Sequence, residues 1–204
     1  MVEKKPTRIQ AANRAKIRAA ALEMFARDGF RGATVDAIAA AAGMSKPNLL
    51  YYFPSKEAIY AEVLEGLLED WLDPLRALNP EGEPAGEIAA YIRRKIELAR
   101  DYPVESRLFA NEMLRGAPIL GDVLARDLKA LVDEKAAVLR GWMADGRLAA
   151  VDPHHLIFAI WATTQHYADF DVQVRAVLGC ADQGRFDDAA ETLTGLVLNG
   201  LLPR

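Results

Sequence analysis

The chain is poor in the features that mark secreted and membrane-spanning proteins. It holds one cysteine, Cys180, among 204 residues, so no disulfide can form within the chain, and a reducing compartment fits this usage. No apolar stretch approaches the roughly 18 residues that a membrane-spanning helix needs. The N-terminal segment is charged and lacks the apolar core of a signal peptide. We therefore expect a cytoplasmic protein with no membrane partner.

Patterns for catalysis and for cofactor or metal binding are also missing. The sequence contains no G-x-S-x-G elbow, no P-loop and no G-x-G-x-x-G dinucleotide motif. His154 and His155 are adjacent and point about 100° apart on a helix, whereas a helical metal-binding pair needs i, i+4 spacing. We expect no enzyme, no catalytic residue, no cofactor and no metal site.

Charge is unevenly distributed along the chain. Residues 1–60 hold ten lysines and arginines against five acidic residues, a net charge of +5, although the whole chain has a net charge of -4. A basic module can attract a polyanion through phosphate contacts and counterion release. A solvated basic tail would give the same pattern, so charge alone leaves both interpretations open.

Hydrophobic periodicity predicts an all-α fold. Apolar residues recur at spacings of three and four, and proline, glycine and capping residues separate the segments. Gly29 is expected to end the first helix, Pro74 to kink or end the fourth, and Asp152-Pro153 to start a late one. About nine helices are expected, over residues 11–28, 34–42, 45–52, 55–72, 86–101, 104–115, 119–145, 153–178 and 187–200.

Residues 34–52 have the spacing of a helix-turn-helix. Gly43 permits a left-handed turn, and Thr34 and Ser45 are suited to cap the two helices. The apolar residues that can pack these helices are Ile38, Ala39, Ala42, Leu49 and Leu50. Side chains suited to base edges and phosphates occupy the exposed positions of the second helix, which are Lys46, Pro47, Asn48, Tyr51 and Tyr52. The same geometry also occurs in proteins that bind no DNA.

The segment GATVDAIAAAAGMSKPNLLYYFPSKEAIY, which begins at Gly32, resembles the DNA-binding domain of the TetR family of transcriptional repressors. The matching elements are Gly32-x-Thr34-Val35, Ile38-Ala39, Ala42-Gly43-Met44-Ser45, Tyr52-Phe53 and Ser55-Lys56-Glu57. The family usually has tyrosine where this chain has Leu50, and the neighbouring Tyr51 can supply that phosphate contact instead. With the phosphate-binding lysine that the resemblance implies, the expected DNA-binding residues are Thr34, Ser45, Lys46, Pro47, Asn48, Tyr51, Tyr52 and Lys56.

The resemblance continues beyond this domain. YIRRKIELARDYPVESRLF (91–109) and DPHHLIFAIWATTQHYADF (152–170) are similar to the body of pyrimidine-sensing members of the family. Such members are homodimers that uracil or thymine releases from operator DNA. The resemblance implies a DNA-binding domain over residues 1–54, with helix-turn-helix and three helices, and a larger ligand-binding and dimerisation domain over residues 55–204.

Trp161 and Gln165 lie one helical turn apart and make a chemically suitable pair for a flat heterocycle. The indole can stack on a ring face, and the amide can both donate to and accept from an imide edge. With Trp71, these residues are the ligand contacts that the resemblance implies for uracil or thymine. Tryptophan and a satisfied glutamine are also common in helical cores, so the residues alone do not decide between these roles.

The last two helices are expected to form the dimer. The final segment carries a stripe made of Leu193, Leu196, Val197 and Gly200. This helix can alternatively cover only the core of its own subunit. For the whole chain, the alternatives are a helical small-molecule carrier without DNA function and a regulator of the same family with a different effector. The basic arm and the complete recognition surface favour the DNA-binding regulator.

Overall fold

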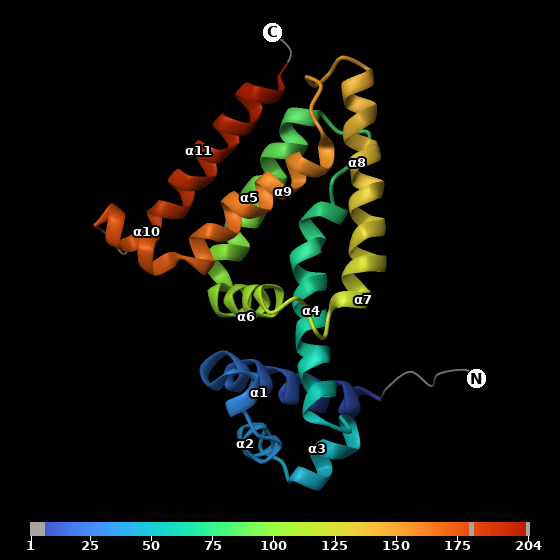
Figure 1. Cartoon of the computed structure of the whole chain (residues 1–204), viewed down its shortest axis with the longest axis vertical. Helices are drawn as coiled ribbons and strands as arrows, with labels where there is room; N and C mark the ends of the chain where they lie inside the picture. The colour runs from blue at the N-terminus through green and yellow to red at the C-terminus, as the bar shows by residue number, and fades with distance from the viewer. Residues whose placement is uncertain (1–6, 180–181, 203–204) are drawn as a thin grey trace, which may run out of the picture. The chain divides into compact units, whose positions relative to one another are not determined.

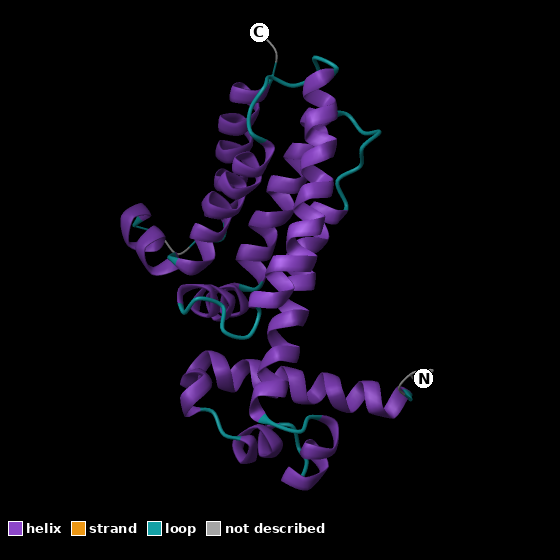
Figure 2. Ribbon diagram, turned by 45° about the vertical axis from the view of Figure 1, so that its right-hand side comes forward, coloured by secondary structure: helices purple, strands orange, loops and turns teal. Residues whose placement is uncertain are grey.

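The computed structural model describes residues 7–179 and 182–202, and every regular element in these ranges is helical (Figure 1, Figure 2). The all-α prediction is therefore confirmed. Cys180 lies outside the described residues. The contacts divide the chain into two compact units, the first ending at Leu68 and the second beginning at Glu69. None of the described helices is long and apolar enough to cross a membrane.

The first unit contains α1 (Arg8–Gly32), α2 (Val35–Ala41), α3 (Lys46–Tyr52) and the first part of α4 (Lys56–Arg76). The helix α1 starts earlier than predicted, because Thr7 and Gln10 form a capping box that satisfies its first amides. Gly29 has a φ of 68° and so leaves the helical conformation where the helix end was predicted. The buried core of this unit includes Ile17, Ala21, Met24, Phe25, Ile38, Leu49, Phe53, Ile59 and Leu64.

The second unit contains the rest of α4, and Pro74 lies inside its final turn. The proline was predicted to kink or end this helix, and the helix ends two residues beyond it. The other elements are α5 (Pro84–Asp101), α6 (Pro103–Leu114), α7 (Gly121–Val123), the π-helical η1 (Leu124–Leu128), α8 (Lys129–Ala144), α9 (Pro153–Asp169), α10 (Asp171–Leu178) and α11 (Gly184–Leu201).

The described residues form ten helices, rather than about nine, when the adjoining α7, η1 and α8 are counted as one. The extra helix arises because the predicted segment 153–178 is interrupted at Phe170. Its φ of -115° and ψ of 28° leave the helical region, and its N–H bonds to the His166 carbonyl at 3.0 Å. Asp171 then starts α10 and accepts from Arg185 at 2.8 Å. No proline or glycine marks this break in the sequence.

The helix α5 is central to the second unit, because it packs against both α9 and α11, and α9 packs in turn against α8 (Figure 1). Glu83 caps α5 by accepting from the Gly86 amide at 2.7 Å. Burial of large apolar side chains, at about 1.5–3 kcal/mol each, stabilises this packing. The buried apolar cluster here is Leu75, Leu78, Ile88, Tyr91, Ile92, Val132, Leu139, Trp142, Leu148, Ile157, Ile160 and Leu201.

Candidate DNA-binding surface and effector site

The helices α2 and α3 both begin at the capping contacts that the sequence predicts. The Thr34 hydroxyl accepts from the Ala37 amide at 3.2 Å, and the Ser45 hydroxyl accepts from the Asn48 amide at 3.4 Å. Gly43 has a φ of 69°, a left-handed conformation that a residue with a Cβ adopts only at a cost. Gly43 therefore makes the turn between α2 and α3, and Ser45 begins α3.

The helix α3 is anchored by a single buried side chain. Leu49 is fully buried, whereas Leu50 is 37% exposed. The expectation that Leu50 packs in the core is therefore wrong, because the next residue along a helix lies about 100° around its axis from the anchored one. Four of the positions of α3 that were predicted to contact DNA have exposed side chains, namely Lys46, Pro47, Asn48 and Tyr51.

Tyr52 differs from the other expected DNA contacts because its phenol has a partner within the unit. Its hydroxyl accepts from Asn13 Nδ2 of α1 at 2.8 Å, and its side chain is only partly exposed. The ring of the 72% exposed Tyr51 meets that of Tyr52 edge to face at 5.2 Å. Tyr52 thereby supports both α3 and the exposed Tyr51 ring.

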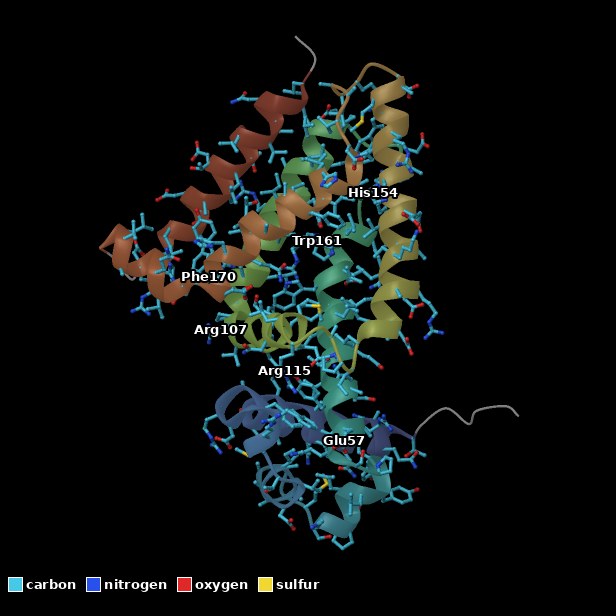
Figure 3. The ribbon with its side chains drawn as sticks, in the orientation of Figure 1. Glu57, Arg107, Arg115, His154, Trp161 and Phe170 are labelled. Carbon is cyan, nitrogen blue, oxygen red and sulfur yellow. The ribbon has the colours of Figure 1, made fainter. Side chains whose placement is uncertain are left out.

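The two lysines of the expected surface are both engaged. Lys46 pairs with Asp36 at 2.9 Å, and both side chains are about half exposed or more. The Lys56 ammonium donates to the carbonyls of Phe30 at 2.8 Å and Ala33 at 3.0 Å, and it also lies 4.6 Å from the Phe30 ring centroid. Lys56 therefore joins the start of α4, where Glu57 follows it (Figure 3), to the end of α1.

In the second unit, the packed helices α5 and α9 each carry a row of candidate site residues. On α9, Trp161, Gln165 and Asp169 follow each other at i, i+4 spacing, and on α5 Tyr91 and Lys95 do the same. The Trp161 indole N–H donates to the Tyr91 hydroxyl at 2.5 Å, which fixes the register of the two rows. Figure 3 shows Trp161 midway along α9, between His154 at the start and Phe170 just beyond the end.

Tyr91 and Trp161 are the aromatic residues at one end of the two rows. Burial raises the pKa of the Tyr91 phenol, so this hydroxyl stays neutral and can accept from the indole. Trp161 is partly exposed, and its ring lies 5.7 Å from that of Phe158. The face of the indole thus remains part of a half-buried aromatic surface.

Gln165 occupies the middle of the α9 row. Its side chain is partly buried, and among the described residues its amide makes no hydrogen bond. Trp71 of α4 is 7% exposed, and the Lys95 Nζ lies 5.5 Å from the centroid of its ring. Trp71 and Trp161 are therefore both linked to the α5 row, one through Lys95 and the other through Tyr91.

Asp169 closes the α9 row at its C-terminal end. Its carboxylate accepts from the buried Ser106 hydroxyl of α6 at 2.6 Å. Burial raises the pKa of the Asp169 carboxyl, while the Ser106 hydrogen bond and the positive charges of Arg107, Lys95 and His166 oppose that rise. Arg107 also donates to the Ala168 carbonyl at 3.4 Å, which joins α6 to the end of α9.

Sequence reasoning missed Lys95, Tyr91 and Ser106. Lys95 is 3% exposed, and burial lowers the pKa of its amine to about 7, against a smaller opposing effect of Asp169. The signal was present, because Lys95 interrupts the core-facing stripe of α5 formed by Ile88, Tyr91, Ile92, Ile96 and Ala99. A charged residue at such a position is a candidate for a functional group.

The histidines serve local structure where the structure describes them. Asp152 accepts from the His154 and His155 amides at 2.8 and 3.1 Å, and so caps α9 as predicted. The His154 ring also bonds Asp133 of α8 at 2.9 Å. Over residues 7–179 and 182–202, no group of three or more histidine, cysteine or acidic side chains is placed to hold a metal ion.

The fold and the capped turn of the first unit define a helix-turn-helix transcriptional regulator with a separate helical body. Residues 17–63 match the family model of the bacterial regulatory proteins of the tetR family, and residues 64–204 match that of the YcdC-like protein C-terminal region. The HTH-type transcriptional regulator RutR of Escherichia coli K12 is 50% identical over 202 residues, which cover 98% of this chain and 95% of that protein. The chain belongs to the TetR family of transcriptional regulators, whose partner is operator DNA.

Similar folds occur among solved structures. A transcriptional regulator from Streptomyces coelicolor has a TM-score of 0.74 and 28% identity, covering 93% of this chain and 98% of that one. The fatty acid degradation regulator FadR from Bacillus halodurans has a TM-score of 0.70 and 20% identity, covering 96% and 97%. The second likeness concerns the fold alone.

Proposed function

We propose that this TetR-family regulator is a homodimeric repressor that a planar pyrimidine, uracil or thymine, releases from its operator. Its DNA-binding domain comprises residues 1–54, and residues 55–204 bind the effector and form the dimer. The observation that carries the effector assignment is the set of Trp71, Trp161 and Gln165 beside α5, in a chain whose body resembles pyrimidine-sensing members of the family.

DNA binding is assigned to the exposed face of α3 and its surroundings. Asn48 has the side chain suited to a bidentate pair with adenine, and Lys46 and Tyr51 can reach guanine or the DNA backbone. Thr34, Ser45 and Pro47 position the backbone of the two helices against the DNA, and Tyr52 supports the exposed face of α3. The Lys56 ammonium donates two of its three N–H groups to carbonyls, and the third can bind a DNA phosphate. In a two-fold dimer, the two α3 helices would enter major grooves about 34–36 Å apart.

The effector contacts follow from hydrogen-bond complementarity. The Gln165 amide can donate to a ring carbonyl and accept from the adjacent ring N–H, while the tryptophans cover the ring faces. A ligand acts as inducer only if it binds one conformation of the protein more tightly than the operator-binding conformation. Trp71 lies on α4, the helix that begins in the DNA-binding unit, so a ligand beside Trp71 can influence that helix directly.

The dimer is assigned to α9 and α11. Leu196 of α11 is 69% exposed and Phe158 of α9 is 47% exposed. Contact with a second subunit would remove these large apolar side chains from water. Leu193 and Val197 of the expected stripe are partly buried against the core of their own subunit, so they contribute less to an interface than Leu196 does. Leu196→Arg should yield a folded monomer by sedimentation, whereas Leu114→Arg, at an 84% exposed leucine of α6, should leave the dimer intact.

Native mass spectrometry tests the proposal as a whole. The protein is mixed in turn with uracil, thymine, cytosine and adenine, with and without an operator duplex. The expected result is a dimer that takes up uracil or thymine and loses the duplex as it does so. Uptake of another compound would replace the effector, and uptake of none of the four with an unaffected duplex would refute the pyrimidine assignment while leaving DNA regulation in place.

A further inference from the structure

Lys95 is an ionisable side chain held inside the second unit without a hydrogen-bonding partner among the described residues. It is 3% exposed, and among the described residues its ammonium makes no hydrogen bond or ion pair within 4 Å. Its Nζ lies 5.5 Å from the centroid of the Trp71 ring. Removing an ammonium from water is costly unless partners compensate, and one cation–π contact compensates only in part.

The comparison with a second buried lysine shows that this arrangement is not general in the fold. Lys135 of α8 is 6% exposed, but its amine bonds the Leu78 carbonyl at 3.4 Å and pairs with Glu134 at 3.2 Å. Lys135 thus has the partners that a structural buried lysine needs. Lys95 lacks them, so a structural role does not account for its position.

Lys95 lies among the residues assigned to the effector. It contacts Trp71, it follows Tyr91 by one turn on α5, and Tyr91 accepts from Trp161. Asp169, whose charge acts on Lys95, follows Gln165 by one turn on α9. Within the proposed effector set, Trp71 therefore contacts Lys95, whereas Trp161 and Gln165 are linked to it through Tyr91 and Asp169.

We propose that the Lys95 ammonium binds a ring carbonyl oxygen of the effector, so that the site selects rings with a carbonyl on each side of a ring N–H. This deepens the proposed function and rests on it. Gln165 pairs with the N–H and one carbonyl, and Lys95 donates to the second carbonyl. A hydrogen bond between a charged donor and a buried acceptor discriminates strongly, because an unmatched ligand leaves the donor unpaired.

The test is calorimetry with uracil and with 4-pyrimidinone, which keeps one carbonyl beside an N–H and lacks the second carbonyl. Wild type, Lys95→Met and the control Lys135→Met are compared at pH 8 in two buffers of different ionisation enthalpy. Wild type should bind uracil about 10–100-fold more tightly than Lys95→Met does. Lys135→Met should match wild type, and Lys95→Met should lose the wild-type preference for uracil over 4-pyrimidinone.

The two buffers report how many protons the protein takes up or releases on binding. Because the amine of Lys95 has a pKa near 7 in the free protein, a carbonyl that stabilises its charged form should cause net proton uptake on binding at pH 8. Uptake in wild type and its loss in Lys95→Met are expected. Equal uracil affinity in wild type and Lys95→Met, or binding without proton uptake, would overturn the role of Lys95. Failure of wild type to bind uracil would instead refute the effector assignment itself.

Discussion

The candidate site of the first unit and that of the second differ in how their charged side chains are exposed to water. In the first unit, Lys46 and Arg14 are paired with acids at the surface, at 2.9 and 2.7 Å, and remain 49% and 39% exposed. In the second unit, Lys95 is buried and Asp169 is half-buried, with the Ser106 hydroxyl as the hydrogen-bonding partner of the carboxylate. A surface that binds a polyanion works through hydrated charges that exchange counterions for phosphates, whereas a site for a small ring needs polar groups that have lost their water.

The same difference appears in how each unit holds its binding residues. The helix α3 depends on caps and on one anchor, Leu49, and the side chains of Asn48 and Tyr51 on its other face are exposed. Among the proposed effector residues, Trp161 is fixed by a contact between helices, with Tyr91. Changes in the first unit should therefore alter DNA contacts or the α3 anchor, and changes in the second should alter ligand chemistry and pH dependence.

The largest expected effect is on the anchor of α3. Leu49→Ala should reduce the free energy of opening of the first unit by about 2–5 kcal/mol, because the side chain is fully buried. Its neighbour Leu50→Ala, at a partly exposed position, should change it by about 0.5 kcal/mol or less. Hydrogen exchange of the α1–α3 amides measures both. Similar effects at the two positions would contradict the single-anchor description of α3.

A pH effect on stability should be specific to the second unit. Burial lowers the pKa of the Lys95 amine to about 7, so between that pH and the ordinary pKa of lysine the unfolded chain binds more protons than the folded one. Stability therefore rises with pH in this window, and the penalty of the buried charge is complete below it. Lys95→Met should stabilise the protein, and the gain should be about 2–3 kcal/mol larger at pH 6 than at pH 9.

Denaturant unfolding of wild type and Lys95→Met across this range provides the measurement. Subtracting the unfolding free energies of the two proteins removes the pH dependence that other titratable groups contribute equally to both. Asp169 is the exception, because Lys95 helps to lower the pKa of its carboxyl. Lys135→Met serves as control and should show no gain that depends on pH in this way. A pH-independent difference for Lys95→Met would mean that the amine is hydrated in the folded protein.

Asn48 should contribute to the recognition of the operator's base sequence. Asn48→Ala should relax the preference for one base pair in each half-site, at about 1–3 kcal/mol, because the exposed amide is suited to adenine. Binding to a set of operators that differ at single positions measures this preference. A uniform loss over all the operators would instead identify Asn48 as a backbone contact.

The smallest expected effect concerns Lys56. Lys56→Ala should weaken binding to all sequences alike and lower the slope of log affinity against log salt by about one unit. The same change removes the two hydrogen bonds to the Phe30 and Ala33 carbonyls, so the variant is compared below its unfolding temperature. Weaker binding with an unchanged salt slope would assign Lys56 a purely supporting role in the first unit.

The all-helical fold was predictable because capping and turn chemistry is local. Thr34, Gly43, Ser45 and Asp152 each act within four residues of their own position. The break at Phe170 was not predictable in this way, since no proline or glycine marks it and the residue after it, Asp171, bonds Arg185 from a later helix. Leu50 was assigned to the core because an apolar side chain does not reveal which face of a short helix it occupies.

The arrangement of the proposed effector residues was visible in the sequence only in part. The spacing of Trp161 and Gln165 on one helix is visible in the sequence, but their relation to Tyr91, Lys95 and Ser106 depends on how α5, α6 and α9 pack. Helix packing brings together residues more than 60 positions apart, as in the bond between Ser106 and Asp169. Such pairs cannot be inferred from one sequence.

The variant Gln165→Leu tests most directly whether the second unit binds the effector while the first unit binds DNA. Operator binding of wild type and of this variant is measured with increasing uracil, alongside calorimetry with uracil alone. Both proteins should bind the operator equally well without uracil, and uracil should release wild type but not Gln165→Leu, because the variant loses the amide that pairs with the ring. Release of the variant at the same uracil concentration as wild type would contradict the assigned site.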